Sequence, residues 1–356
     1  MTRKRIASVR KKLNDLGLDA FIVSHPSNIR YLTGFTGSNA LLVISPRRNS
    51  LLTDSRYRQQ SRLEVRGCRV LVNGTSLFEA AAKESLLVRF RRVGFEGNHL
   101  PYTAYQNLRK LFHGVRFLPK VNVIESIASV KDISEIKSIR KAVRISDKVF
   151  RDILGMMKPG VRELEIAAEI SYRQRMEGAE GDAFDAIVAS GWRSALVHGR
   201  ASTKKIHAGE LVTLDFGCSV GGYHSDLTRT VAVGSPSKRA REIYRIVLEA
   251  QERAIEAAQG GLPARRLDEI ARGYIRSRGY DEYFGHSLGH GLGLRVHELP
   301  RISSHSRDTL ESGNVITIEP GIYIPKFGGV RIEDDILVTN GHSVVLNTAP
   351  KDFVVL

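Results

Sequence analysis

Five side chains of the types that bind metal ions stand in the last 142 residues of the 356-residue chain. They are four carboxylates and one imidazole, and together we call them the ligand set: Asp215, Asp226, His290, Glu319 and Glu333. An oxygen-rich set with a single nitrogen favours Mn²⁺, Co²⁺ or Zn²⁺ over a structural zinc site built on thiolates. Without metal, four carboxylates in a partly dry site would repel one another, whereas two dications would balance their charge. The residue types therefore predict two divalent metal ions with a water between them.

The two aspartates belong to one run, LVTLDFGCSVGGYHSDLTRTVAVG, residues 211–234. Two stretches rich in β-formers flank a turn that contains glycines, and this pattern predicts a hairpin. Paired strands bring residues that are distant along the chain within a few ångströms, so the two acids could share an ion pair. Asp215 has apolar neighbours, among which an unpaired charge would be costly. A metal ion would remove that cost.

The other three members stand in glycine-rich or apolar surroundings. His290 belongs to FGHSLGHGLGLRVHELP, which lacks the G-x-G-x-x-G spacing of a nucleotide loop and has no following helix signal. We expect its glycines to let the backbone approach a ligand closely. Glu319 and Glu333 belong to the runs VITIEPGIYIP and GGVRIEDDILV, which read as β-strands. Both glutamates are predicted to face a buried site.

With these motifs in this order, the sequence resembles the creatinase-like, or pita-bread, metallopeptidases over nearly its whole length. The resemblance is closest to the Xaa-Pro peptidases, prolidase and aminopeptidase P. It implies that the ligand set binds two divalent metal ions per subunit. Asp226 and Glu333 would bridge the two ions, and Asp215 would complete one of them. His290 and Glu319 would complete the other.

The resemblance also implies roles for three further histidines. His198, in SALVHGRAS, would help to hold the substrate near the scissile bond, although the family usually has proline where this chain has Val197. His297 would hydrogen-bond the scissile carbonyl or the oxyanion, and His286 would line the pocket for the prolyl ring. Two groups would lie around the Asp215 carboxylate as outer partners, Arg331 and Tyr323. Glu298 reads either as a substrate contact or as a solvated charge.

The activity implied is hydrolysis of the bond between an N-terminal residue and proline. A hydroxide bridging the two ions would attack the carbonyl while one ion polarises it. Glu319 would carry the proton from the water to the departing prolyl nitrogen.

Other members of the family give alternative functions. Methionine aminopeptidase shares the five ligands but usually lacks an N-terminal domain of this kind, and creatinase shares the two domains but works without the metals. A nonenzymatic RNA-binding or anion-binding relative would generally have lost ligands.

Two domains are predicted from the order of elements. Residues 1–125 should form an α/β domain with a mixed sheet. For residues 126–356 the resemblance implies an α+β pita-bread catalytic domain. Strands are expected at residues 19–23, 40–44, 50–53, 68–72, 92–96 and 114–118. Apolar residues at helical spacing predict a first helix over residues 2–13, and a long amphipathic helix is expected near residues 134–157. The similar runs PGVRELEIAAE and LPARRLDEIAR indicate an internal duplication.

Charge is distributed unevenly between the domains. Residues 1–130 contain 22 Lys and Arg against 8 Asp and Glu, whereas the rest of the chain is nearly neutral. We interpret this excess as a solvated, arginine-rich face, because no RNA-binding motif accompanies it, so nucleic acid is not expected as a partner. No apolar run is long enough to span a membrane. Two widely separated cysteines, Cys68 and Cys218, predict a reducing, cytoplasmic setting, and the family resemblance implies a homodimer.

Overall fold

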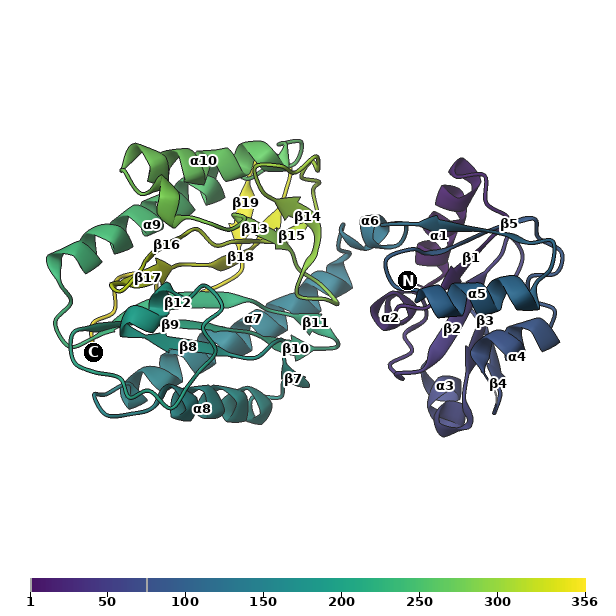
Figure 1. The fold of residues 1–356 in the computed structure, drawn as a ribbon, viewed down its shortest axis with the longest axis horizontal. Helices are drawn as coiled ribbons and strands as arrows, with labels where there is room; N and C mark the ends of the chain where they lie inside the picture. The colour runs from purple at the N-terminus through teal and green to yellow at the C-terminus, as the bar shows by residue number, and fades with distance from the viewer. Residues whose placement is uncertain (1, 75) are drawn as a thin grey trace. The chain divides into compact units, whose positions relative to one another are not determined.

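The computed structural model describes residues 2–74 and 76–356 and divides into two compact units, Met1–Ala128 and Ser129–Leu356 (Figure 1). Each unit has its own buried apolar clusters. Within the described ranges, no helix has the length and apolar character that a membrane crossing requires.

A six-stranded mixed sheet forms the centre of the first unit, in the order β4-β3-β2-β1-β5-β6. Its strands are β1 (Ala20–Val23), β2 (Ala40–Ile44), β3 (Asn49–Thr53), β4 (Arg69–Val72), β5 (Arg92–Glu96) and β6 (Arg116–Lys120). The pairs β1–β5, β5–β6 and β3–β4 are parallel, whereas β1–β2 and β2–β3 are antiparallel. All six expected strands and the mixed character of the sheet are confirmed.

Several helices accompany this sheet in the first unit. They are α1 (Thr2–Asp15), α2 (Pro26–Thr33), the 3₁₀ turn η1 (Ser55–Tyr57), α3 (Arg58–Glu64), α4 (Leu77–Lys83), α5 (Tyr102–Leu111) and α6 (Glu125–Ala128). In α1 the side chains of Ile6, Val9 and Leu13 are buried, as their spacing of three and four residues predicts. The basic amino terminus is therefore the first helix of the fold.

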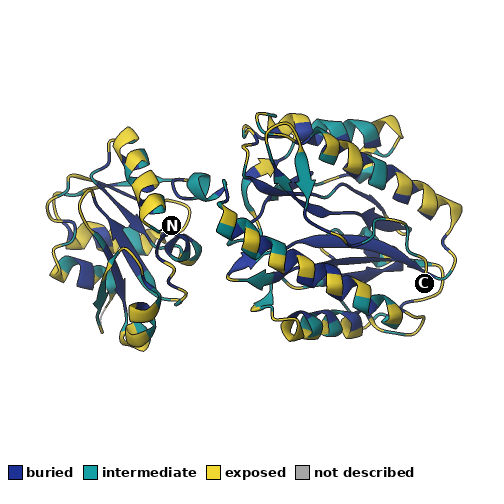
Figure 2. Cartoon of the chain, turned by 180° about the vertical axis from the view of Figure 1, so that it is seen from behind, coloured by how far each residue is buried: buried dark blue, intermediate teal, exposed yellow. Residues whose placement is uncertain are grey.

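Four long helices flank the strands of the second unit. They are α7 (Ile133–Ile153), α8 (Glu163–Met176), α9 (Lys238–Ala257) and α10 (Ala264–Ser277), with the 3₁₀ turns η2 (Leu154–Met156), η3 (Gly191–Ala195) and η4 (Asp281–Tyr283). The pair α7–α8 lies on one side of the strands and the pair α9–α10 on the other (Figure 1). A long helix precedes a short one in both pairs, in keeping with an internal duplication. Figure 2 shows the strands buried and the outer faces of the helices exposed.

The strands of the second unit form several small sheets. They are β7 (Gly181–Asp182), β8 (Ile187–Ser190), β9 (Glu210–Phe216), β10 (Cys218–Val220), β11 (Tyr223–His224), β12 (Leu227–Val233), β13 (Gly289–Gly291), β14 (Glu298–Ile302), β15 (Val315–Ile318), β16 (Gly321–Ile324), β17 (Gly328–Arg331), β18 (Asp334–Val338) and β19 (Ser343–Val345). The sheet orders are β11-β10-β7, β12-β9-β8, β14-β13-β15-β18-β19 and β16-β17. β9 and β12 pair antiparallel from Phe216↔Leu227 onward, so the predicted hairpin is confirmed.

The two halves of this unit meet where β12 runs beside the segment between β17 and β18. The backbone N–H of Glu333 donates to the carbonyl of Thr228 at 3.1 Å. Thr230 exchanges two hydrogen bonds with the backbone of Arg331, at 3.0 and 3.1 Å. Side chains from both halves are thereby held at one junction.

The glycines around His290 have a packing role that the sequence did not reveal. β13 lies between β14 and β15, and a methyl group on Gly289 would lie 2.0 Å from the carbonyl oxygen of Thr317. A methyl group on Gly291 would lie 2.0 Å from the carbonyl oxygen of Leu299. The absence of side chains at these glycines therefore lets the neighbouring strands approach β13 closely, and not a ligand as expected.

Gly217, the single residue between β9 and β10, gives a test of how tightly the hairpin is packed. A methyl group on Gly217 would lie 1.8 Å from the carbonyl oxygen of Ser225, which is backbone and cannot rotate away. We expect Gly217→Ala to lower the free energy of unfolding by about 1–3 kcal/mol, as overpacking does. Urea denaturation measures this change.

A matched control is Gly155→Ala, because no atom lies within 4 Å of the added methyl group there. Its effect should stay within about 0.5 kcal/mol. Equal effects of the two substitutions would show that the hairpin adjusts freely around Gly217.

Candidate metal centre

The members of the ligand set come from five separate places in the second unit. Asp215 lies within β9 and His290 within β13. Asp226 directly precedes β12, Glu319 directly follows β15, and Glu333 lies between β17 and β18. Only two of the five thus lie inside strands, and of the four acids, all expected in strands, only Asp215 does. A residue just outside a strand is free of the strict alternation of faces, so its side chain can turn toward the centre.

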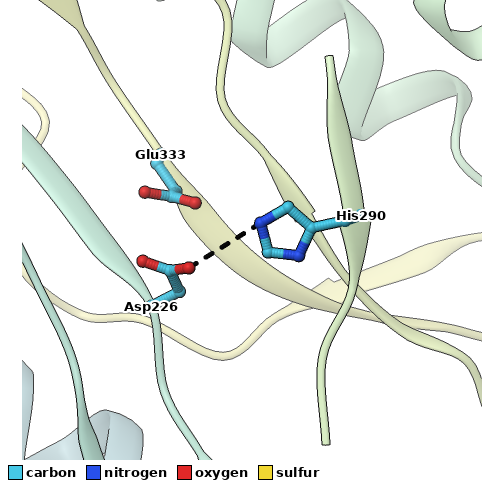
Figure 3. A group of neighbouring side chains, drawn as sticks. All are labelled: Asp226, His290 and Glu333. Atoms are coloured by element: carbon cyan, nitrogen blue, oxygen red, sulfur yellow. Dashed lines mark ion pairs between the residues drawn. The ribbon is translucent and has the colours of Figure 1, made fainter. Parts of the chain in front are cut away.

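Three members form a compact group. Asp226, His290 and Glu333 each offer a ligand atom, and these atoms lie within 4.8 Å of one another. Figure 3 shows the three side chains pointing toward one another from different segments of the chain. His290 Nε2 lies 3.8 Å from Asp226 Oδ2 and 3.4 Å from Glu319 Oε1, so Glu319 borders the group. Asp215 is near enough for its charge to act on Asp226, Glu319 and Glu333.

Burial and mutual repulsion make the charged forms of these acids costly. Burial raises the pKa of Asp226 well above its ordinary value, and the charges of Glu333 and Asp215 raise it further. Burial likewise raises the pKa of Glu333, with Glu319 adding to the effect. For Glu319, burial raises the pKa to about 8. A bound cation would reverse this repulsion, because it would supply the opposite charge that the site lacks.

His290 has the geometry of a ligand. Its Nδ1 lies 3.1 Å from the carbonyl oxygen of Gly291, so Nδ1 carries the proton and donates it there. Nε2 is then a free lone pair directed at Asp226 and Glu319. Burial lowers the pKa of His290 to about 4, which keeps the ring neutral, as metal coordination requires.

Two buried carboxylate oxygens at this site also favour a bound cation. Among the residues that the structure describes, Asp215 Oδ1 and Asp226 Oδ1 are buried and accept no hydrogen bond. Buried polar atoms are nearly always satisfied, so orphaned oxygens in a carboxylate cluster need another partner. Hard oxygen donors together with one neutral imidazole fit a divalent ion such as Mn²⁺, Co²⁺ or Zn²⁺.

Arg331 connects two of the metal-ligand candidates, Asp215 and Glu333, through hydrogen bonds. Its Nη2 donates to Asp215 Oδ2 at 2.6 Å, and its Nη1 donates to the Tyr323 hydroxyl at 2.8 Å. Its Nε donates to Thr228 Oγ1 at 3.1 Å, and that hydroxyl donates to Glu333 Oε2 at 2.6 Å. Arg331 therefore contacts Asp215 directly, whereas Tyr323 acts on it through Arg331. These contacts orient two of the five candidates.

Thr228 and Asp335 belong to this network but were absent from the sequence interpretation. Asp335 Oδ2 accepts the backbone N–H of Asp226 at 3.0 Å. Thr228 stands two residues after Asp226, within β12, so its closeness to Asp226 in the sequence could have drawn attention to it. Asp335 gave no such signal, because its contact depends on pairing between distant segments.

The three other histidines surround the group. His286 uses both ring nitrogens inside the protein, Nδ1 with the carbonyl of Ser287 and Nε2 with the Tyr323 hydroxyl, each at 2.8 Å. His297 packs its ring edge-to-face on His290 with centroids 4.3 Å apart, yet it remains exposed. His198 is also exposed, and its charge acts on both His286 and His297. The structure thus places all four imidazoles about one site.

The loop that carries His198 is fixed although Val197 replaces the family proline. Arg331 Nη1 donates to the carbonyl of Val197 at 3.2 Å, and Gly329 N donates to Ser194 Oγ at 2.8 Å. Both bonds tie the loop to β17. The backbone position before His198 is therefore held by hydrogen bonds rather than by a proline ring.

Comparison with known proteins gives consistent results. Residues 137–340 match the model of metallopeptidase family M24, and residues 5–130 match the creatinase/prolidase N-terminal domain. The Xaa-Pro dipeptidase of Pyrococcus furiosus is 40% identical over 357 residues, covering 99% of this chain and 100% of the relative. A solved Xaa-Pro dipeptidase from Bacillus anthracis superposes with a TM-score of 0.97 at 41% identity and covers 100% of both chains. The X-Pro aminopeptidase from Thermotoga maritima gives a TM-score of 0.90 at 38% identity, covering 97% of this chain and 100% of that one.

Substitution of Asp226 tests whether the group is built for cations. In metal-free protein, Asp226→Asn removes one buried charge from a repelling cluster, so we expect a thermal midpoint equal to or above that of the wild type. Wild type should gain about 2.7 kcal/mol with Mn²⁺ at one hundred times its dissociation constant, and the variant should lose this gain. Thermal unfolding after chelation and Mn²⁺ addition measures both.

Asp185 provides the control, because Asp185→Asn changes the same functional group at an exposed position, where its partner is Arg200. This variant should keep the full Mn²⁺ response. An undiminished Mn²⁺ response in Asp226→Asn would refute a role for Asp226 in metal binding.

Proposed function

The chain belongs to metallopeptidase family M24 and carries the creatinase/prolidase N-terminal domain, and from this membership we propose that it is a metal-dependent Xaa-Pro peptidase. The observation that carries the proposal is the convergence of Asp226, His290 and Glu333 within 4.8 Å at a buried junction. Relatives named Xaa-Pro dipeptidase and X-Pro aminopeptidase, at about 40% identity over nearly the whole chain, support the substrate class.

The ligand set would hold two divalent ions, with manganese, cobalt or zinc as the candidates. Asp226 and Glu333 are proposed as the bridging ligands, Asp215 as a ligand of one ion, and His290 and Glu319 as ligands of the other. Such ions lower the pKa of water and polarise a carbonyl. The residues of the chain supply the orientation and the proton transfers.

Glu319 is the proposed proton carrier. Its carboxylate lies at the edge of the group, 3.4 Å from His290 Nε2, and accepts a hydrogen bond from Thr317 Oγ1 at 3.3 Å. A carboxylate at this position takes a proton from the attacking water and delivers it to the prolyl nitrogen as the bond breaks. Because the imide nitrogen must leave as an amine, this delivery is a required step.

His297 and His198 are the proposed substrate contacts. Both imidazoles are exposed next to the buried group, so a peptide can reach them while its scissile carbonyl faces the ligand set. His297 Nε2 or Nδ1 can donate to the developing oxyanion, an interaction that strengthens as the carbonyl becomes tetrahedral. His198 would help to hold the peptide near the scissile bond.

His286 is suited to the prolyl ring for a different reason. Both its ring nitrogens are committed to Ser287 and Tyr323, so it can offer a substrate only its carbon edge and its face. Burial lowers its pKa to about 3, which keeps the ring uncharged. A neutral surface without free donors matches an imide ring that has no N–H to offer.

We also propose a cytoplasmic homodimer. Cys68 and Cys218 are both free thiols, consistent with a reducing compartment. The outer face of α8 carries exposed Leu164, Tyr172 and Met176 at helical spacing, an apolar stripe that a second copy would cover.

Light scattering tests the assembly, with an expected mass of twice one chain. Tyr172→Glu should shift the mass toward one chain, because a charge would enter the apolar contact. Ile133→Glu, at an equally apolar but separate exposed position, should leave the dimer intact. A monomeric wild type would contradict the proposal.

A peptide panel tests the activity. With Mn²⁺, Co²⁺ or Zn²⁺ present, we expect cleavage of Xaa-Pro dipeptides or of Xaa-Pro-Yaa peptides before proline, and no cleavage of Met-Ala-Yaa. Glu319→Gln should lower kcat by about 10²-fold or more, because general acid–base transfer contributes about 10²–10⁴-fold. Product release is measured by chromatography.

Two outcomes of the panel would replace the proposal. Preference for Met-Ala-Yaa would indicate a methionine aminopeptidase. No hydrolysis of any peptide, with metal bound, would favour a binding protein that uses the basic N-terminal unit. His198→Ala is the matched variant for Glu319→Gln, since it should affect KM as well as kcat.

A further inference from the structure

A buried ion pair lies directly beside the proposed catalytic histidine. The Lys131 side chain is 1% exposed and the Glu298 side chain 8% exposed, and Lys131 Nζ lies 3.1 Å from Glu298 Oε2. Glu298 Oε1 accepts the backbone N–H of Arg295 at 3.0 Å. The carboxylate is thus turned into the protein, and the interpretation of Glu298 as a solvated charge is wrong.

Such a pair is a poor means of stabilising a fold. Desolvation of a lysine and a glutamate costs several kcal/mol per ion, and a well-packed apolar pair of the same volume is often equally stable. Lysine also loses up to about 2 kcal/mol of side-chain entropy when it is fixed. The contribution of this pair to stability therefore does not explain its burial. The groups that it holds in position explain it better.

Glu298 is linked through the backbone to two histidines of the site. It directly follows His297 and is the first residue of β14. Its Cα pairs with that of Gly291, the neighbour of His290, at a point where the strand register shifts. Its carboxylate also lies against Gly293, where a methyl group would come within 2.4 Å of Oε2. A displacement of the Glu298 side chain would therefore move His297 against His290.

Lys131 is itself anchored at its backbone. Its N–H donates to the carbonyl of Gly313 at 2.8 Å, and Val130 forms an isolated bridge with Asn314. Asn314 Nδ2 donates to the carbonyl of Ser129 at 3.0 Å. The segment that carries Lys131 is thereby fixed to the turn that precedes β15. The Lys131 ammonium therefore has a fixed position and holds the Glu298 carboxylate in place.

We propose that Lys131 is a positioning residue for His297 and acts through Glu298. The ammonium fixes the Glu298 carboxylate, and the carboxylate fixes the start of β14 and the imidazole immediately before it. Lys131 does not touch the substrate. This inference rests on the proposed function, because His297 is taken to stabilise the oxyanion of Xaa-Pro hydrolysis.

The experiment is a double-mutant cycle on the full-length, Mn²⁺-loaded protein. Lys131→Met keeps the length of the side chain and removes the charge, and Glu298→Gln keeps the shape and removes the opposite charge. We expect each to lower kcat for an Xaa-Pro peptide by about 10–100-fold with KM changed less than about threefold, since misplacement of about 1 Å costs about 10²-fold. In the His297→Ala background, both should change kcat by less than about twofold.

A matched control is Lys204→Met. Lys204 pairs with Glu210 at 2.7 Å in the same unit and has no contact with the β13–β14 segment among the described hydrogen bonds. The kcat of Lys204→Met should remain within about twofold of the wild-type value. Lys131→Arg restores the charge and should recover part of the lost kcat.

A second readout is independent of catalysis. In crystal structures with Mn²⁺, wild type should keep the edge-to-face contact of His290 and His297, with ring centroids near 4.3 Å, and Glu298→Gln should not. Unchanged ring geometry, or equal losses of kcat with and without His297, would overturn the inference. A wild type that cleaves no Xaa-Pro peptide refutes the proposed function, and the ring geometry still decides whether the pair positions His297.

Discussion

Electrostatic repulsion among buried carboxylates is the constraint on which the catalytic unit depends. Asp226 and Glu333 are almost fully removed from solvent, and burial together with the charges of neighbouring carboxylates raises the pKa of both. A fold that gathers them must hold each carboxylate at a fixed place against this repulsion. Arg331 holds the Asp215 carboxylate, and the hydroxyls of Thr228 and Thr317 donate to Glu333 and Glu319.

Two buried arginines, Arg331 and Arg229, support the segments that carry these acids. Arg331 joins Asp215 to Thr228 and Tyr323. Arg229 lies behind it and donates to the carbonyl oxygens of Thr228 and Glu333 and to the Asp334 carboxylate. These cations leave the inward-facing oxygens of Asp215 and Asp226 without hydrogen bonds. The unpaired oxygens of the two aspartates therefore mark the place where a cation would bind.

The sequence predicted those parts of the fold that depend on local pattern. The spacing of Ile6, Val9 and Leu13 identified α1, and alternation and β-branched residues identified six strands of the first sheet. The ligand set was recognisable because a charged acid among apolar neighbours is costly unless a cation compensates it. The Lys131–Glu298 pair escaped detection, since its members are 167 residues apart and each has an ordinary local context. The glycines beside His290 were visible, but their reason, the carbonyls of adjacent strands, exists only after the sheet forms.

The site also draws its side chains from both helix–strand halves of the unit, as the hydrogen bond from Thr228 to Glu333 shows across 105 residues. The entropy of closing so long a loop must be overcome before any ligand from one half meets one from the other. Assembly of the centre is therefore a late event in folding, because non-local pairings form slowly. Tight retention of metal then distinguishes chains whose halves have docked from those that have not. A chain arrested earlier presents its acids separately, and none of them alone retains an ion.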